Sequence, residues 1–254
     1  MSNSLTVLGS ASGLPSATRA CSGYLLTVNN SLSLIDCGGG VVASFLKLGF
    51  DPHRLDRVFI SHTHSDHVGD LALLIQLLHG VNSYRRLDIY LPESFVEIYR
   101  AYLTGVYLVP ERLKSDPVLH GYRDGFEFEN GFRLRAVANN HLSSIVEDFR
   151  RLELPHDFQC HSFRMEIGDS TVFYTADIDG FADARPHLQN LDLVLIEGTH
   201  IEFPELLSFT RDASVRQWVV THVSDQDIEP LQSLIDRAGV PNVRVAYDGL
   251  VLPL

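Results

Sequence analysis

The stretch FISHTHSDHVGDL, residues 59–71, constrains the fold more than any other part of the chain. It places three histidines and two aspartates between His62 and Asp70, directly after the apolar run LDRVFIS, which is typical of a buried strand. Apolar residues then recur at helical spacing, at Val68, Leu71, Leu74, Ile75 and Leu78. The pattern predicts a strand, a short polar loop and an amphipathic helix that begins within the histidine cluster.

The residue types and spacing of this loop indicate a metal site. His62 and His64 are separated by one residue, so in extended backbone they point to the same side and converge on one ion. Asp66 and His67 are adjacent at the predicted helix start and suit a second ion. Imidazole together with carboxylate favours Zn, Mn or Fe over Ca or Mg. A solvated polar loop is the alternative, but this spacing at a strand end is rare by chance.

Two metal shells need more ligands than one loop supplies. His141, Asp177 and His222 each follow an apolar strand pattern: RLRAVANNH, TVFYTAD and QWVVTH. α/β folds commonly build their sites at the C-terminal ends of strands. A lone histidine is more often an ordinary core or surface residue, but the three strand-end positions together predict the missing ligands.

Turn signals between apolar runs predict antiparallel hairpins. They centre on Asn29 and Asn30, on Asn130 and Gly131, and on Gly168 and Asp169. The near-continuous apolar runs LDRVFIS and LDLVLIEG predict strands that are buried on both faces. The chain therefore combines hairpins with parallel strands.

Helical patterns cover residues 93–108 and 229–238, whereas residues 142–159 read as a loop with at most one helical turn. No repeat or Pro/Gly/Ser linker divides the chain, so residues 1–254 are expected to form one domain. The sum predicts an α/β fold with two sheets packed face to face and helices outside, a four-layer arrangement.

Charge and composition restrict the partners. The chain has 20 Lys and Arg against 32 Asp and Glu, a net charge of −12, so long nucleic acid is not an expected partner. No apolar run approaches the roughly 18 residues of a membrane span, and the first residues lack a secretory pattern. A cytoplasmic protein is expected. Cys21, Cys37 and Cys160 form no C-x-x-C pair and are expected to be buried thiols.

The motif SHTHSDH resembles the signature of the metallo-β-lactamase superfamily. The opening LTVLGSASGLPSATRACSGYLL with LSLIDCGGG, and the later motifs YTAD, THVS and LIEGT, resemble its ribonuclease Z-like branch. The resemblance implies an αββα sandwich, two divalent metal ions and hydrolysis of phosphodiesters. It also suggests a homodimer.

The resemblance assigns roles to the candidate ligands. His62, His64 and His141 would hold one ion, Asp66, His67 and His222 the other, and Asp177 would bridge them. Zinc is the first expectation, with manganese or iron as alternatives. A metal-bridged hydroxide would attack phosphorus, and Asp66 would also orient or deprotonate this nucleophile. Asp36, at the end of LSLID, would either hold a ligating histidine or cap the turn before the glycines.

Three departures from that branch bear on the substrate. His141 and Asp177 lie 36 positions apart, which leaves no room for the long arm of the tRNA-processing enzymes. Residues 201–220 contain no histidine to protonate the leaving oxygen. His200, with Glu197 as its partner, is a candidate substitute, against the alternative of an ordinary loop histidine. Gly39 stands where the branch commonly has Glu.

These departures favour a small phosphodiester, such as a cyclic nucleotide or another cyclic phosphate, over precursor tRNA. Arg150 or Arg151 would pair with phosphate, or both are simply solvated. A carboxylic ester, lactone or thioester is the alternative substrate, because the same metal core polarises a carbonyl. A metal-bound protein with little turnover is the remaining alternative.

Overall fold

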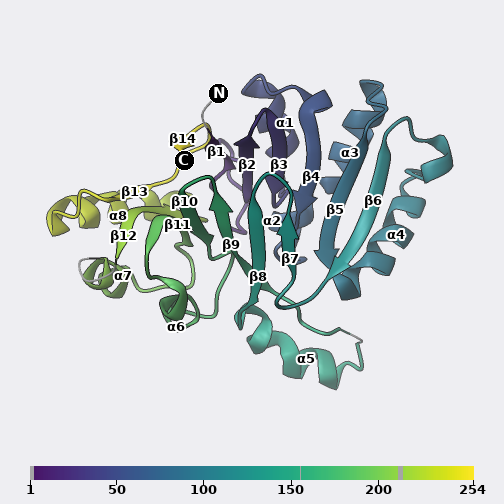
Figure 1. Ribbon diagram of the computed structural model, residues 1–254. Helices are drawn as coiled ribbons and strands as arrows, with labels where there is room; N and C mark the ends of the chain where they lie inside the picture. The colour runs from purple at the N-terminus through teal and green to yellow at the C-terminus, as the bar shows by residue number, and fades with distance from the viewer. Residues whose placement is uncertain (1–2, 155, 211–213) are drawn as a thin grey trace. The chain divides into compact units, whose positions relative to one another are not determined.

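The computed structural model describes residues 3–154, 156–210 and 214–254 (Figure 1). The chain divides into two compact units. Unit 1 comprises Met1–Arg123 with Tyr247–Leu254, and unit 2 comprises Asp124–Ala246. Unit 2 is therefore one continuous insertion into the sequence of unit 1. The expectation of a single domain over residues 1–254 stays a prediction.

Unit 1 is built on a seven-stranded sheet with the strand order β14-β1-β2-β3-β4-β5-β6 (Figure 1). Its strands are β1 Ser4–Gly9, β2 Gly23–Val28, β3 Ser31–Ile35, β4 Leu55–Phe59, β5 Arg86–Pro92, β6 Asp116–Tyr122 and β14 Val251–Pro253. Strands β14, β1, β2 and β3 pair antiparallel, and β3 to β6 pair parallel. The run LDRVFIS thus forms an inner parallel strand, as predicted.

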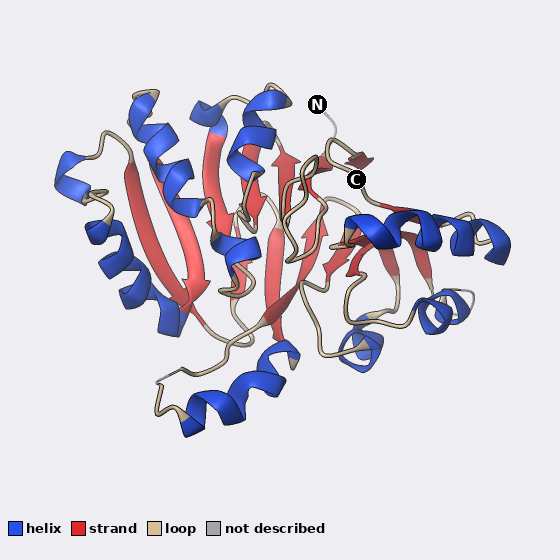
Figure 2. Ribbon diagram, turned by 180° about the vertical axis from the view of Figure 1, so that it is seen from behind, coloured by secondary structure: helices blue, strands red, loops and turns tan. Residues whose placement is uncertain are grey.

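The helices of unit 1 cover one face of this sheet (Figure 2). They are α1 Val41–Lys47, α2 Ser65–Val68, α3 Leu71–Gly80 and α4 Val96–Gly105, with 3-10 turns at Pro52–Arg54, Glu93–Phe95 and Pro110–Arg112. The apolar stripe of α3 is buried, as its spacing predicts: Leu71, Leu74, Ile75 and Leu78. These side chains pack with Val58 and Ile89 of the sheet in one core. The pattern over 93–108 is thus a 3-10 turn followed by α4.

The hairpin between β2 and β3 shows why the turn signal is reliable. Asn29 and Asn30 both have positive φ, 48° and 71°. A two-residue hairpin turn of this type needs positive φ at both positions, which asparagine tolerates better than most residues. The predicted hairpin is confirmed, with Val28 opposite Ser31.

The helix expected from the histidine cluster onward is broken in two. Between α2 and α3 the chain passes through Gly69 and Asp70, and the Asp70 Oδ2 atom accepts hydrogen bonds from Gly40 N at 2.9 Å and Val42 N at 3.1 Å. The side chain of Asp70 therefore caps the first turn of α1, while its backbone begins α3. Periodicity could not show this, because the partner lies 30 residues earlier.

Unit 2 is built on a second seven-stranded sheet, ordered β13-β12-β11-β10-β9-β8-β7. Its strands are β7 Glu127–Glu129, β8 Arg133–Ala138, β9 His161–Ile167, β10 Ser170–Tyr174, β11 Leu191–Glu197, β12 Val215–Thr221 and β13 Val243–Val245. The two other predicted hairpins are confirmed. Residues 130–132 connect β7 to β8 with Gly131 at φ 81°, and Gly168, at φ 61°, turns β9 into β10. The run LDLVLIEG forms β11, parallel to both neighbours.

The helices of unit 2 are α5 Val146–Arg151, α6 Phe181–Ala184, α7 Phe203–Phe209 and α8 Asp225–Ala238, with 3-10 turns at His141–Ile145 and Arg185–His187. Helices α6, α7 and α8 pack on one face of the sheet in a core that includes Trp218 and Val194. Helix α8 extends the helix predicted at 229–238 by four residues.

The expectation of a loop over 142–159 is wrong for its first half. Residue 155 of this segment lies outside the described residues. The 3-10 turn and α5 together form a helical stretch from His141 to Arg151. Leu142 of this stretch is buried, and Phe149 makes ring contacts with residues that follow the helix. Its ring packs against His156 and Phe158 with centroids 5.7 and 5.5 Å away. Throughout the described ranges, no helix has the length and apolar character needed to cross a membrane.

Candidate metal centre

Unit 1 presents four of the predicted ligands on the loop after β4 and on α2. The ring centroids of His62 and His64 lie 4.8 Å apart, as expected for imidazoles that converge. The side chains of Asp66 and His67 meet as well, with 3.4 Å between Asp66 Oδ2 and His67 Nε2. His62 and His67 are completely buried. The loop therefore directs imidazole and carboxylate groups of adjacent residues toward one another.

Asp36 fixes the orientation of His67. It follows β3 in the left-handed region, with φ 55°, and its Oδ2 lies 2.8 Å from His67 Nδ1. Its carboxylate also accepts hydrogen bonds from Ser61 N at 2.7 Å and Ser61 Oγ at 2.8 Å. Because a carboxylate only accepts, Nδ1 of His67 carries the hydrogen and Nε2 keeps the lone pair that a metal needs. Of the two roles considered for Asp36, the structure shows the support of a histidine.

Ser61 does the same for His62. Its hydroxyl donates to Asp36 Oδ2, so an oxygen lone pair faces His62 Nδ1 at 3.1 Å. Two strands away in the sheet, Tyr122 of β6 donates its hydroxyl to the Ile60 carbonyl at 2.5 Å and braces the start of the loop. No pattern in the sequence indicated this contact of Tyr122.

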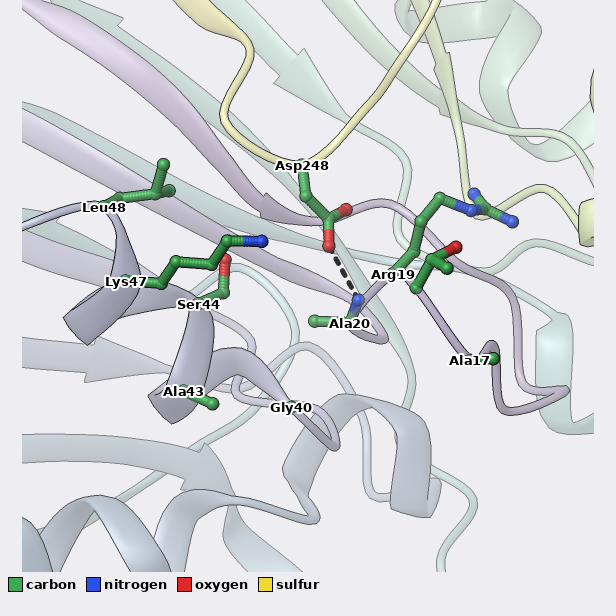
Figure 3. A pocket seen from close by; sticks show the side chains of 10 residues that line it. Ala17, Arg19, Ala20, Gly40, Ala43, Ser44, Lys47, Leu48 and Asp248 are labelled. Atoms are coloured by element: carbon green, nitrogen blue, oxygen red, sulfur yellow. Dashed lines mark hydrogen bonds between the residues drawn. The ribbon is translucent and has the colours of Figure 1, made fainter.

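A cavity of about 370 Å³ lies beside Asp66 in unit 1. Part of its wall is the loop of residues 10–20, including Gly13 and Arg19. Asp248 holds both ends of this loop, because it accepts hydrogen bonds from Ser10 N at 3.0 Å and Ala20 N at 2.7 Å. Figure 3 shows the second of these bonds at a neighbouring cavity of about 330 Å³, which shares Arg19 with the first. The cavity beside Asp66 is of small-molecule size.

Two of the three cysteines, Cys21 and Cys37, lie in this region. Cys21 lines the cavity, and burial followed by the charge of Asp66 raises the pKa of its thiol. Burial raises the pKa of Cys37 well above its ordinary value. All three cysteines are buried and unpaired by disulfides, as predicted. Thiols of this kind stay protonated and are poor metal ligands.

Unit 2 presents the other three predicted ligands. The Nε2 atoms of His141 and His222 lie 3.7 and 3.4 Å from Asp177 Oδ2. One carboxylate oxygen thus faces two imidazoles. Ala176, immediately before Asp177, and His222 itself both have left-handed backbone, with φ 50° and 55°. Such strain in non-glycine residues is concentrated at functional sites.

The turn after β11 organises a further pair. His200 Nδ1 lies 3.1 Å from Glu197 Oε1, and the His200 N–H also donates to this carboxylate. The hydrogen bond to Glu197 raises the pKa of His200 against the opposing effect of burial. The ring of His200 lies near His141, with centroids 4.9 Å apart. Unit 2 thus brings the candidate pair together with a predicted ligand, and its catalytic role stays a prediction.

The donor set fits metal. The described residues include histidine and aspartate groups able to hold an ion. His62, His67 and His222 each have an oxygen atom at Nδ1, contributed by Ser61, Asp36 and Thr199. This arrangement presents the Nε2 atoms as ligands. His and Asp donors suit Zn, Mn or Fe.

Thr199, a residue the sequence did not reveal, makes the contact with His222. Its place in the LIEGT motif was the signal in the sequence.

The arginines of α5 contact acidic neighbours on the surface. Arg151 pairs with Asp148 at 2.7 Å and Arg150 with Glu147 at 3.9 Å, and all four side chains are exposed. The structure therefore agrees with the second interpretation of these arginines, that they are solvated surface residues.

Comparison with known proteins places this chain in a family. Residues 3–230 match the family described as anti-Pycsar protein Apyc1. The chain is 24% identical to ribonuclease Z of Clostridium botulinum (strain Eklund 17B / Type B) over 98% of both chains. It is 27% identical to the probable metallo-hydrolase YhfI of Bacillus subtilis (strain 168) over 86% of both.

Solved structures agree. The crystal structure of YhfI, a metallo-β-lactamase fold protein from Bacillus subtilis, matches with a TM-score of 0.77 and 22% identity over 99% of both chains. A diphosphatase from the PhnP family matches with a TM-score of 0.74 and 18% identity, covering 99% of this chain and 98% of that one. The predicted α/β, metallo-β-lactamase-like fold class is confirmed. The chain is a ribonuclease Z-like, metal-dependent hydrolase of the metallo-β-lactamase superfamily and belongs to the family of the anti-Pycsar protein Apyc1.

Proposed function

We propose that the chain hydrolyses small phosphodiesters, cyclic ones included, with two divalent metal ions as cofactors. His62, His64 and His141 would hold one ion, Asp66, His67 and His222 would hold the other, and Asp177 would serve both. The observation that carries this proposal is the position of Asp177 Oδ2, within 3.7 Å of His141 Nε2 and 3.4 Å of His222 Nε2. These histidines are assigned to different ions, so the oxygen between them suits a bridge. Zinc is our first choice, with manganese or iron as alternatives.

When bound, such a pair of ions lowers the pKa of water and stabilises charge that develops on phosphoryl oxygens. Asp66 orients the attacking water and takes its proton. A carboxylate suits this step because it only accepts hydrogen bonds, whereas an amide would also donate. Asp66 lines the cavity of about 370 Å³, so it lies where a small substrate enters unit 1.

His200 acts as the acid for the leaving oxygen in this proposal. Its Nδ1 lies 3.1 Å from Glu197 Oε1, so Nε2 is the atom that would donate. The hydrogen bond to Glu197 keeps the pKa of His200 above its ordinary value, which extends the protonated form toward neutral pH. Glu197, completely buried, holds the imidazole in place.

Three properties support a small substrate. The net charge of −12 disfavours a long phosphate backbone. His141 and Asp177 lie only 36 positions apart in the sequence, and the arginines of α5 pair with acidic neighbours. The ribonuclease Z relatives support phosphodiester chemistry. The PhnP-family diphosphatase supports phosphate chemistry more generally.

The test compares bis(p-nitrophenyl) phosphate with lactone and thioester substrates, using protein of known metal content and an Asp66→Ala variant. We expect diester turnover that needs about two ions per chain and disappears in the variant. Turnover of lactones alone would favour carbonyl substrates. Two bound ions without turnover of any substrate would favour the metal-bound protein with little activity.

A leaving-group series tests His200 separately. p-Nitrophenolate leaves without a proton, whereas an alkoxide needs one, so His200→Asn should slow methyl p-nitrophenyl phosphate far less than an alkyl diester. Equal slowing of both would remove His200 from the role of acid. The expected homodimer and cytoplasmic location stay predictions, and sedimentation of the purified protein measures the first.

A further inference from the structure

The turn of residues 197–200 contains a threonine whose hydroxyl contacts a predicted metal ligand twice. Thr199 Oγ1 lies 2.7 Å from the backbone oxygen of His222 and 3.1 Å from Nδ1 of the same residue. We propose that Thr199 is a positioning residue that fixes the tautomer of His222 for metal binding and ties this ligand to the Glu197–His200 pair. The inference rests on the proposed function, because it assigns His222 to a metal ion.

The tautomer follows from counting hydrogens. The hydroxyl of Thr199 has one hydrogen, and the carbonyl oxygen of His222 can only accept it. An oxygen lone pair of Thr199 therefore faces His222 Nδ1, so Nδ1 must carry the ring hydrogen. Nε2, which lies 3.4 Å from Asp177 Oδ2, then keeps its lone pair. With the other tautomer Nε2 would carry the hydrogen and could not bind an ion.

The backbone of His222 gives a second reason for the contact. His222 directly follows β12 and has φ 55°, a left-handed conformation that non-glycine residues adopt at a cost. The hydrogen bond from Thr199 engages the carbonyl of this strained residue. Thr199 thus holds the ring and the backbone of the same ligand.

The backbone N–H of Thr199 is held by the carboxylate of Glu197, which also holds His200. Glu197 Oε2 accepts hydrogen bonds from the backbone N–H groups of Thr199, at 2.5 Å, and His200, at 3.0 Å. Glu197 is completely buried, so its carboxylate is shielded from solvent. One carboxylate therefore positions both the support of a metal ligand and the candidate acid.

The test uses Thr199→Val, which keeps the shape and loses the hydroxyl, and Thr199→Ser, which keeps the hydroxyl. Metal-depleted protein is titrated with Co²⁺, followed by its visible absorption, and with Zn²⁺ against a chromophoric chelator. We expect the valine variant to bind one of the two ions about 10- to 100-fold more weakly and the other nearly unchanged. The serine variant should recover most of the loss.

Wild-type affinity for both ions in Thr199→Val would overturn the inference, and so would a serine variant as weak as the valine variant. Wild-type protein that binds no metal would instead refute the proposed function. A direct measurement covers a variant that fails to fold. Long-range ¹H–¹⁵N correlation spectra of metal-depleted wild-type protein should show the hydrogen on Nδ1 of His222, and a hydrogen on Nε2 would contradict the assignment.

Discussion

Replacing Asp36 by Asn tests the support of His67 with a change of only one atom type. Asp36 accepts three hydrogen bonds, from Ser61 N, Ser61 Oγ and His67 Nδ1. An asparagine would turn its carbonyl oxygen to the Ser61 N–H, so its NH₂ group would face His67 Nδ1. Since NH₂ donates, Nδ1 would have to accept, and the ring hydrogen would move to Nε2. His67 would then present a hydrogen where an ion should bind.

The magnitude follows from the number and type of bonds affected. Loss of such a support to a ligating histidine typically weakens metal binding 10- to 100-fold, which is about 1.4 to 2.7 kcal/mol. The metal-free protein should also be less stable, by a similar amount. Asp36 is completely buried, and exchanging a charged acceptor for a neutral one costs roughly 1 to 3 kcal/mol of folding free energy.

The assay is a Zn²⁺ titration of metal-depleted protein against a chromophoric chelator, with circular dichroism to show that the variant is folded. Ser61→Ala is the matched control, because it removes the hydroxyl bond to Asp36 and leaves the bond to His67 intact. We expect Asp36→Asn to weaken the ion held by His67 and Ser61→Ala to affect mainly the ion held by His62. A folded Asp36→Asn protein with two ions at wild-type affinity would refute the tautomer argument.

Further predictions concern backbone space, a remote histidine and metal removal. Gly38→Ala should abolish metal binding, because a Cβ there would lie 1.9 Å from the backbone oxygen of Asp66, whereas Gly39→Ala should be tolerated, since its nearest neighbour is 3.9 Å away. Equal metal titrations of the two variants would contradict this. Burial and nearby arginines lower the pKa of His187, so protonation opposes folding, and stability should fall as pH drops from about 6.5 through the folded-state pKa. Arg164→Gln should raise that pKa in an NMR titration, and an unchanged value would exclude the arginine as a cause. Chelation of metal should lower the melting temperature, since an ion at 100 times its Kd contributes about 2.7 kcal/mol, and an unchanged melting temperature would argue against resident ions.

Local chemistry explains what the sequence predicted well. The turn at Asn29 and Asn30 needs positive φ, and the residues that tolerate it are visible in the sequence. The strand and the block from His62 to His67 are likewise local, since ligands two residues apart share a side of extended chain. The strand ends before Asp177 and His222 could be located because apolar runs end there.

What the sequence did not predict depends on contacts between distant segments. Asp70 breaks a regular helical pattern because it caps a helix that starts 30 residues earlier. Thr199 has no pattern of its own, and its role arises from a contact with a residue 23 positions later. Such pairings carry no signature in either segment alone.

The insertion of unit 2 into unit 1 has a consequence for the order of events during synthesis. The loop of residues 10–20 is secured at both ends by Asp248, and β1 pairs with β14. Both partners are translated only after all of unit 2, Asp124–Ala246. Domains generally fold as they emerge from the ribosome, N-terminal regions first, so the 124–246 segment can fold as a continuous stretch while unit 1 still waits for its last strand. We therefore expect the loop beside Asp66 to be secured only after residues 247–254 have been synthesised.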